Sequence, residues 1–206
     1  AEVLVVDDGI TDRTAEIVED LAADFPRQLR ALKRPHRGKG AAVAAGMLAA
    51  VGEYRFLCDA DLAMSFSELP RFLEVAERGV DIVVGSREAP GAKRVGEPVR
   101  RHLLGRVFNY VVKLYAVRGI EDTQCGYKLF IAKAALHIFR LLTVEGFAFD
   151  VEVLFIAQLH GYSVEELPIV WYHREHSKVR PIRDSFSMFR QVLSIRRNAL
   201  LGRYRK

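Results

Sequence analysis

Two aspartates one residue apart, Asp59 and Asp61, are the side chains whose type and spacing point most directly to chemistry. They follow the apolar run 54–58, which is long enough for one buried strand. Residues i and i+2 of an extended chain share a face, so both carboxylates can point at one cation. Hard divalent cations such as Mg²⁺ take carboxylate oxygens and also bind substrate phosphates. The pair predicts a nucleotide diphosphate held by a metal; the competing interpretation is a polar turn or helix cap after a strand.

Polar residues also follow two other predicted strands. Asp7 and Asp8 come after the apolar run 3–6, and Arg87 comes shortly after the run 81–84. In open α/β sheets, ligands bind at the carboxyl ends of the strands. The planar guanidinium of an arginine at that edge suits phosphate.

Basic residues stand at the start of two predicted helices. Gly38 and Lys39 precede an alanine-rich helix, whose N-terminus could hold an anion, although a loop with a solvated lysine explains the same residues. Arg100 and Arg101 fall in the first turn of a strongly apolar helix predicted over 99–117. The helix dipole disfavours cations there unless an anion lies nearby, and two solvated arginines are the alternative.

The elements that must position these residues alternate between strand and helix up to residue 87. This alternation predicts an α/β domain with a mostly parallel sheet and covering helices. Right-handed crossovers would bring the polar residues at the strand ends to one edge of that sheet. A helix is predicted from Ser67 to about residue 78. The chain starts directly in a strand pattern without Met, and we expect a first element to be missing.

The second half continues with a strand over 129–131 and another within 162–172, where Pro168 indicates an edge or a bulge. Between them, Asp150 opens a predicted helix and is either its N-cap or a functional carboxylate. The two cysteines, Cys58 and Cys125, form no disulfide framework or metal-binding spacing. No apolar stretch reaches the roughly 20 residues that span a bilayer.

The charge of the chain, formally +5, is concentrated at its C-terminus, where Asp184 is the only acid from Lys178 onward. A basic tail indicates an anionic partner: phosphates, a membrane surface or nucleic acid. Residues 184 to about 197 predict an amphipathic helix with Phe189 and Leu193 on its apolar side. Such a helix either lies in a membrane interface or packs on the domain. We therefore divide the chain into a catalytic domain over 1–183 and a basic helix and tail over 184–206.

Together these motifs resemble the family 2 glycosyltransferases of GT-A fold, in particular the polyprenyl-phosphate sugar synthases of the dolichyl-phosphate β-glucosyltransferase type. The resemblance covers nearly the whole chain, and its most specific blocks are 122–130 and 177–180. The matching segments, in family order, are Val5-Val6-Asp7-Asp8-Gly9, Gly38-Lys39-Gly40, Asp59-Ala60-Asp61, Gly85-Ser86-Arg87, Asp122-Thr123-Gln124-Cys125-Gly126-Tyr127-Lys128, Phe149-Asp150-Val151-Glu152 and Ser177-Lys178-Val179-Arg180.

The resemblance implies inverting transfer of a hexose from a nucleotide sugar, with Mg²⁺ or Mn²⁺ as cofactor, to a polyprenyl phosphate. UDP-glucose is the favoured donor, and GDP-mannose is the alternative. The resemblance also implies a peripheral protein at the cytoplasmic face of a membrane, neither secreted nor bound to nucleic acid. Implied donor-binding residues are Asp7, Asp8, Gly38, Lys39, Asp59, Asp61 and Arg87, with Asp59 and Asp61 as metal ligands. Implied acceptor-phosphate residues are Arg87, Arg100, Arg101, Ser177, Lys178 and Arg180, and Asp122 and Asp150 are implied as catalytic residues that orient the sugar or acceptor.

Three features of the chain depart from the family pattern. The first strand with its nucleotide motif is absent, Ile10 stands where the family has Ser, and Ser65 replaces a Pro after the metal motif. Two rival hypotheses follow. An inactive homologue that binds membranes would explain the truncated start. A phospho-acceptor receiver domain would explain Asp7, Asp8 and Asp59, but it leaves Asp61 and the second half unexplained.

Overall fold

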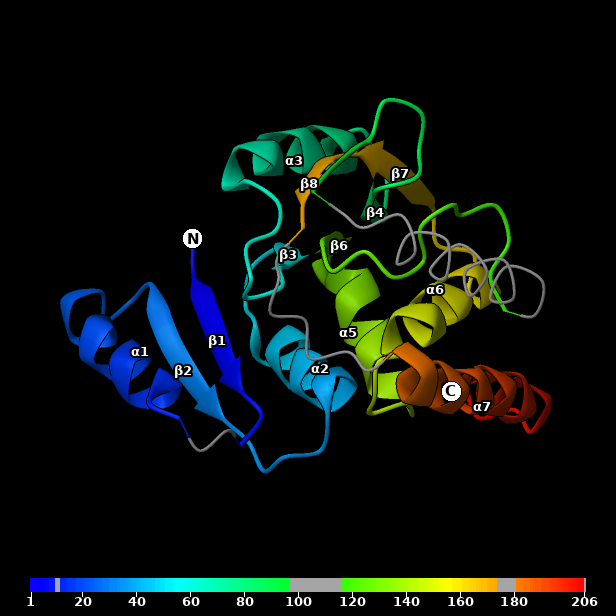
Figure 1. Cartoon of the computed structure of the whole chain (residues 1–206), viewed down its shortest axis with the longest axis horizontal. Coiled ribbons are helices and arrows are strands. Elements are labelled where there is room, and N and C mark those ends of the chain that lie inside the picture. Colours follow the sequence, from blue (N-terminus) through cyan, green and yellow to red (C-terminus); the bar gives the residue numbers. More distant parts are fainter. Residues whose placement is uncertain (10–11, 97–115, 174–180, 206) are drawn as a thin grey trace.

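A four-stranded sheet in the order β3-β6-β4-β7 forms the centre of the computed structural model, which describes residues 1–9, 12–96, 116–173 and 181–205 (Figure 1). Its strands are β3 Tyr54–Leu57, β6 Lys128–Ile131, β4 Ile82–Ser86 and β7 Val164–Pro168. β4 and β7 are parallel, as predicted, but β6 runs antiparallel to both of its neighbours. The α/β class is confirmed, while the central sheet is mixed rather than mostly parallel.

The direction of β6 follows from the contacts of the loop that precedes it. The Arg87 N–H donates to the Asp122 carboxylate (3.0 Å), and the Gly85 N–H donates to the Tyr127 carbonyl (2.8 Å). These bonds place the start of β6 beside the end of β4. A strand that begins at that edge must run back along its neighbour, which makes the pair antiparallel.

Two smaller parallel pairs flank the central sheet. The first is β1 Val3–Asp7 with β2 Leu29–Lys33, joined by helix α1 Thr14–Asp24. The second is β5 Lys93–Val95 with β8 Val170–Tyr172. Helix α2 Lys39–Ala49 contacts both β1 and β3, so it connects the first pair to the central sheet. The expected additional strand before residue 1 stays a prediction.

Helices cover both faces of the central sheet, and alternate strand residues supply the two cores, as the period of two requires. Ile82 and Val84 face one core, while Val83 faces the other. Helix α3 Leu69–Glu77 packs on the Val83 face. The opposite face is covered by α2, α5 Ala132–Leu141, α6 Phe149–Leu159 and α7 Pro181–Leu200 (Figure 1).

Three predicted boundaries shift in the structure. Ser65, not Ser67, caps the turn η1 Phe66–Glu68 that leads into α3, because the Ser65 hydroxyl accepts the Ser67 N–H. The predicted strand within 162–172 is divided into β7 and β8, and the Pro168 prediction is confirmed because β7 is the edge strand. Helix α7 begins at Pro181, before the predicted start at residue 184. The apolar helix predicted over 99–117 lies almost entirely outside the described residues.

Candidate active site

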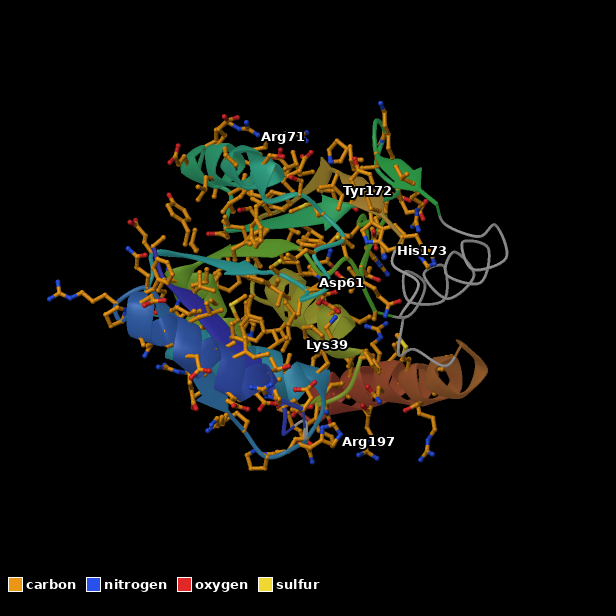
Figure 2. All side chains as sticks on the ribbon, turned by 60° about the vertical axis from the view of Figure 1, so that its left-hand side comes forward. Lys39, Asp61, Arg71, Tyr172, His173 and Arg197 are labelled. Atoms are coloured by element: carbon orange, nitrogen blue, oxygen red, sulfur yellow. The ribbon has the colours of Figure 1, made fainter. Side chains whose placement is uncertain are left out.

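Lys39 and Asp59 form the ion pair at the centre of the candidate site. The Lys39 ammonium, at the start of α2, lies 2.7 Å from Asp59 Oδ1, just beyond β3. Each side chain is about one third exposed, at 32% and 31%. Figure 2 labels Lys39 and Asp61 near each other, between α3 with Arg71 and α7 with Arg197. Asp61 is exposed, and its Oδ1 accepts the Ala63 N–H (3.1 Å), which fixes the turn after β3.

The position of the Asp59 carboxylate depends on Gly126. A Cβ added to Gly126 would lie 2.0 Å from Asp59 Oδ2 and 2.3 Å from its Cγ. The carboxylate therefore rests directly on the backbone of the loop before β6, a place that only glycine leaves open. Tyr127, the next residue, accepts the Met64 N–H on its hydroxyl (2.9 Å) and ties the loop after Asp61 to the same segment.

Asp8 and the two glycines of the 38–40 segment shape the start of α2. The Asp8 carboxylate accepts the Arg37 and Gly38 N–H groups (both 3.0 Å) and pairs with His36 (2.9 Å). Gly38 has φ +119°, and a Cβ there would lie 2.6 Å from the Glu145 carbonyl. That carbonyl also accepts the Gly40 N–H (2.7 Å). The N–H group of Gly40 is thus taken by the protein, and the Lys39 ammonium adds a positive charge at this end of the helix.

Asp150 and Lys128 form a buried pair beneath Lys39. Lys128 Nζ lies 2.5 Å from Asp150 Oδ1, with the two side chains 0% and 5% exposed. Asp150 is in the first turn of α6, and no side chain caps that helix, so the N-cap interpretation of Asp150 is wrong. Burial raises the pKa of Asp150 against the opposing charges of Lys128 and Lys39. Burial alone would lower the pKa of Lys39, but the carboxylates of Asp150 and Asp59 raise it, so Lys39 stays a cation.

Asp122 holds Arg87 in a two-pronged ion pair. Arg87 Nε and Nη2 donate to the two oxygens of Asp122 at 2.7 and 2.8 Å. Burial alone would raise the pKa of Asp122, but the charge and hydrogen bonds of Arg87 lower it to about 2. The Glu166 carboxylate accepts the Asp122 N–H (2.9 Å) and fixes this loop to β7. The Arg87 guanidinium also lies 5.6 Å from the ring centre of Trp171.

The structure thus brings six of the predicted residues into one linked site and leaves others apart. Lys39 joins Asp59, Asp150 and Asp61 electrostatically, and Lys128 extends this group towards Asp122 and Arg87. Asp8 and Gly38 support the start of α2. Asp7 lies at the end of β1, where its carbonyl accepts the Arg34 N–H (2.9 Å). The predicted acceptor residues Arg100, Arg101, Ser177, Lys178 and Arg180 lie outside the described residues.

Three residues of this site were not predicted individually: Gly126, Lys128 and Trp171. Lys128 carried a signal, because a lysine that opens the apolar strand 128–131 needs a buried partner. Gly126 and Trp171 act on residues that are distant in sequence, so the local sequence pattern did not predict their place in the site.

Asp59 and Asp61 are the residues that could hold a divalent cation. Their carboxylate oxygens suit Mg²⁺ or Mn²⁺, and one or two carboxylates suffice where substrate phosphates supply further ligands. Within the described residues no group of three or more His, Cys, Asp or Glu side chains forms a ready-made metal site. The residues therefore fit a cation shared with a diphosphate better than a site made of protein alone.

Comparisons with known proteins identify the family of the chain. The sequence profile described as "Glycosyl transferase family 2" matches residues 1–139. A dolichyl-phosphate beta-glucosyltransferase of Dictyostelium discoideum is 35% identical over an alignment of 209 residues, which covers 98% of this chain and 64% of that protein. The Homo sapiens protein of the same name is 35% identical over an alignment of 219 residues, which covers 99% of this chain and 66% of that protein. The chain thus spans about two thirds of the length of these relatives.

Solved structures extend the likeness to the fold. Glucosyl-3-phosphoglycerate synthase from Mycobacterium tuberculosis, determined with Mn²⁺, UDP-glucose and phosphoglyceric acid, superimposes with a TM-score of 0.62 at 20% identity, covering 98% of this chain and 68% of that one. Mannosyl-3-phosphoglycerate synthase from Rubrobacter xylanophilus gives a TM-score of 0.62 at 19% identity, covering 98% and 65%. These matches confirm the predicted GT-A fold. The profile match over residues 1–139 and the relatives, which align with nearly all of this chain, establish that the chain belongs to glycosyl transferase family 2.

Proposed function

We propose that this chain carries most of the catalytic domain of a dolichyl-phosphate β-glucosyltransferase, which transfers glucose from UDP-glucose to a polyprenyl phosphate. The observation that carries the proposal is the linked row of charges from Asp61 and Asp59 through Lys39 and Lys128 to Arg87. It offers a carboxylate end for a cation and a guanidinium end for a phosphate. The names of the relatives support both substrates, and the Mn²⁺ and UDP-glucose in the solved neighbour support the cofactor and the donor.

In the proposed reaction an acceptor phosphate oxygen forms a bond to the anomeric carbon while the bond from that carbon to the UDP oxygen breaks, which inverts the configuration. The acceptor phosphate is already anionic near neutral pH, so the protein needs no strong general base. A divalent cation at Asp59 and Asp61 would offset the charge that develops on the leaving diphosphate. Lys39 adds a positive charge on the same side, and Arg87 attracts the acceptor phosphate.

Asp122 and Asp150 act through other residues in this proposal. Asp122 is 3% exposed and its carboxylate is taken up by Arg87, so it sets the direction of that guanidinium. Asp150 is 4% exposed and pairs with Lys128, and its charge helps to hold Lys39. Both are positioning residues rather than proton carriers.

We also propose that helix α7 rests on the membrane that holds the lipid acceptor. One face of α7 packs into the domain through Met188, Val192 and Ile195. A second apolar face is exposed: Phe189, Leu193 and Leu200 are 36%, 44% and 87% exposed. At 100° per residue these three fall within about 40° of one another. Both packing on the domain and binding a lipid surface are therefore compatible with one helix.

Arginines flank this exposed apolar face of α7. On the same helical projection Arg196 lies on one side, and Arg190 and Arg197 lie on the other. No acid occurs from residue 185 to the end of the chain. Apolar residues flanked by cations favour a surface with anionic lipids. None of the described helices is both long and apolar enough to cross a bilayer. The position at the cytoplasmic face stays a prediction.

The reaction is tested with the native-length protein, Mn²⁺, polyprenyl phosphate and either UDP-glucose or GDP-mannose, following sugar into the lipid phase. We expect transfer from UDP-glucose, lost on substitution Asp61→Ala and kept in Asp24→Ala, which removes an exposed carboxylate from α1. Transfer from GDP-mannose and not from UDP-glucose would show that GDP-mannose is the donor. Full metal-dependent activity of Asp61→Ala would refute the assignment of the site, and no transfer by folded protein would favour an inactive homologue.

The membrane contact is tested by sedimentation with vesicles that contain anionic lipid. The double substitution Phe189→Ser and Leu193→Ser should release the protein from the vesicles without unfolding it, because both side chains are exposed. The matched control is Ile17→Ser with Leu21→Ser on α1, where the two residues are 50% and 48% exposed. Equal binding of both double variants would refute the role of α7.

A further inference from the structure

The ion pair between Lys39 and Asp59 occupies the carboxylate that the divalent cation would use. Lys39 Nζ lies 2.7 Å from Asp59 Oδ1. The Asp59 carboxylate rests against the backbone of Gly126, where a Cβ would lie 2.0 Å from Oδ2. The Gly126 backbone thus bounds one side of this carboxylate. A cation approaching Asp59 meets a side chain that already has a positively charged partner.

Asp150 and Asp61, as well as Asp59, are carboxylates whose charges act on Lys39. Asp61 is the second carboxylate that the divalent cation would use. Asp150 is already paired with Lys128 at 2.5 Å. Counted as formal charges, Asp59, Asp61 and Asp150 give −3 against +2 from Lys39 and Lys128, a net charge of −1. A dication added while Lys39 stays in place would reverse that sign to +1. Two cations on one carboxylate repel each other strongly where burial lowers the effective dielectric constant.

We infer that Lys39 is a resident counter-ion that keeps Asp59 paired until the donor arrives, and that it then transfers to the donor diphosphate as the divalent cation takes Asp59. This inference rests on the proposed function, since it requires a diphosphate at this site. The Lys39 ammonium lies 5.9 Å from the centre of the Phe149 ring. A lysine carries its charge on a flexible four-carbon stem, so the head group can move while the backbone of α2 stays fixed.

The consequence is a positive coupling between the divalent cation and the diphosphate. Without a diphosphate, the cation must displace the ammonium from its ion pair with Asp59, and Asp150 is already paired with Lys128. With a diphosphate, the displaced ammonium gains a new anionic partner. Each ligand therefore strengthens the binding of the other, and couplings of this kind are typically about 5- to 150-fold. Lys39 is on this account a positioning residue that makes the metal and the donor bind together.

The coupling is measured by electron paramagnetic resonance of free Mn²⁺ titrated with the native-length protein, with and without UDP. We expect wild-type protein to bind Mn²⁺ weakly alone and more tightly with UDP. Lys39→Met, which keeps the apolar stem, should bind Mn²⁺ alone about tenfold more tightly, and its gain from UDP should shrink by about fivefold or more. Lys39→Arg, which keeps the charge, should behave like the wild type.

Arg37→Met is the matched control, because Arg37 is a cation two residues away that pairs with Glu145 instead of Asp59. It should leave Mn²⁺ binding within about twofold of wild type, as expected for a distant surface charge. Adding Asp59→Asn to Lys39→Met should abolish the gain in Mn²⁺ affinity, which would show that the cation binds at Asp59. Unchanged Mn²⁺ affinity in Lys39→Met, or an equal gain in Arg37→Met, would overturn the inference. Wild-type protein that binds no UDP at any Mn²⁺ concentration would instead overturn the proposed function, and the inference with it.

Discussion

Replacing Gly126 by alanine should damage the site through a single contact. The new Cβ would lie 2.0 Å from Asp59 Oδ2, whereas real Cβ contacts almost never fall below 3.0 Å, so the carboxylate must move by at least about 1 Å. Gly126 is not among the residues with positive φ, so alanine adds no backbone strain there. A displacement of about 1 Å at a catalytic site can cost about 10²-fold in rate, which corresponds to about 2.7 kcal/mol.

The assay is glucose transfer, read as kcat/KM, together with the affinity for Mn²⁺ and UDP by calorimetry. Gly161→Ala is the control: φ at Gly161 is +72°, and its Cβ would meet nothing within 4 Å. It should lose about 1 kcal/mol of stability to strain but keep its activity. The double variant Asp59→Ala with Gly126→Ala gives a further check. Without the Asp59 carboxylate, Gly126→Ala should no longer destabilise the fold. Activity of Gly126→Ala within twofold of wild type, or the same stability loss without the Asp59 carboxylate, would refute the reasoning.

Two further predictions concern stability. The pKa of Asp122 is about 2 against an ordinary 3.8, so its contribution is present above about pH 4 and is lost as the pH falls towards 2. Between these pH values the free energy of unfolding of wild-type protein should fall by about 2 kcal/mol more than that of Asp122→Asn, measured with urea; parallel curves would contradict this. Tyr204→Phe removes a hydroxyl that donates to the buried Glu152 carboxylate at 2.5 Å, and should cost about 2 kcal/mol. Tyr172→Phe, at an exposed tyrosine, should cost nearly nothing in the same urea experiment, and equal losses would exclude a special role for the Tyr204 hydroxyl.

The sequence predicted the strands of the site well because each is a short apolar run that ends in polar residues. Asp7 is the last residue of β1, and Asp59 and Arg87 follow β3 and β4 as expected. The two cores also follow from alternation, as in β4, where Val83 faces one side and Ile82 and Val84 the other. Local patterns of this kind need only neighbouring residues, so they survive without tertiary information.

The direction of β6 and the start of α3 were harder to predict. The direction depends on where the preceding loop attaches, and that is decided by bonds such as Gly85 N–H to the Tyr127 carbonyl, across more than 40 residues. The capping residue of η1 depends on which of two serines, Ser65 or Ser67, has its hydroxyl near a free N–H group. Neither feature leaves a periodic signal in the sequence.

The amino-acid sequence alone determined the family, the α/β class and the carboxylates at the ends of strands, because these depend on residue type and local spacing. Only the tertiary structure decided which charges pair. It pairs Asp122 with Arg87, Asp150 with Lys128 and Asp59 with Lys39. These partners come from elements 20 or more residues apart, and a buried charge takes whichever opposite charge the packing brings within reach, since leaving it unpaired would be too costly.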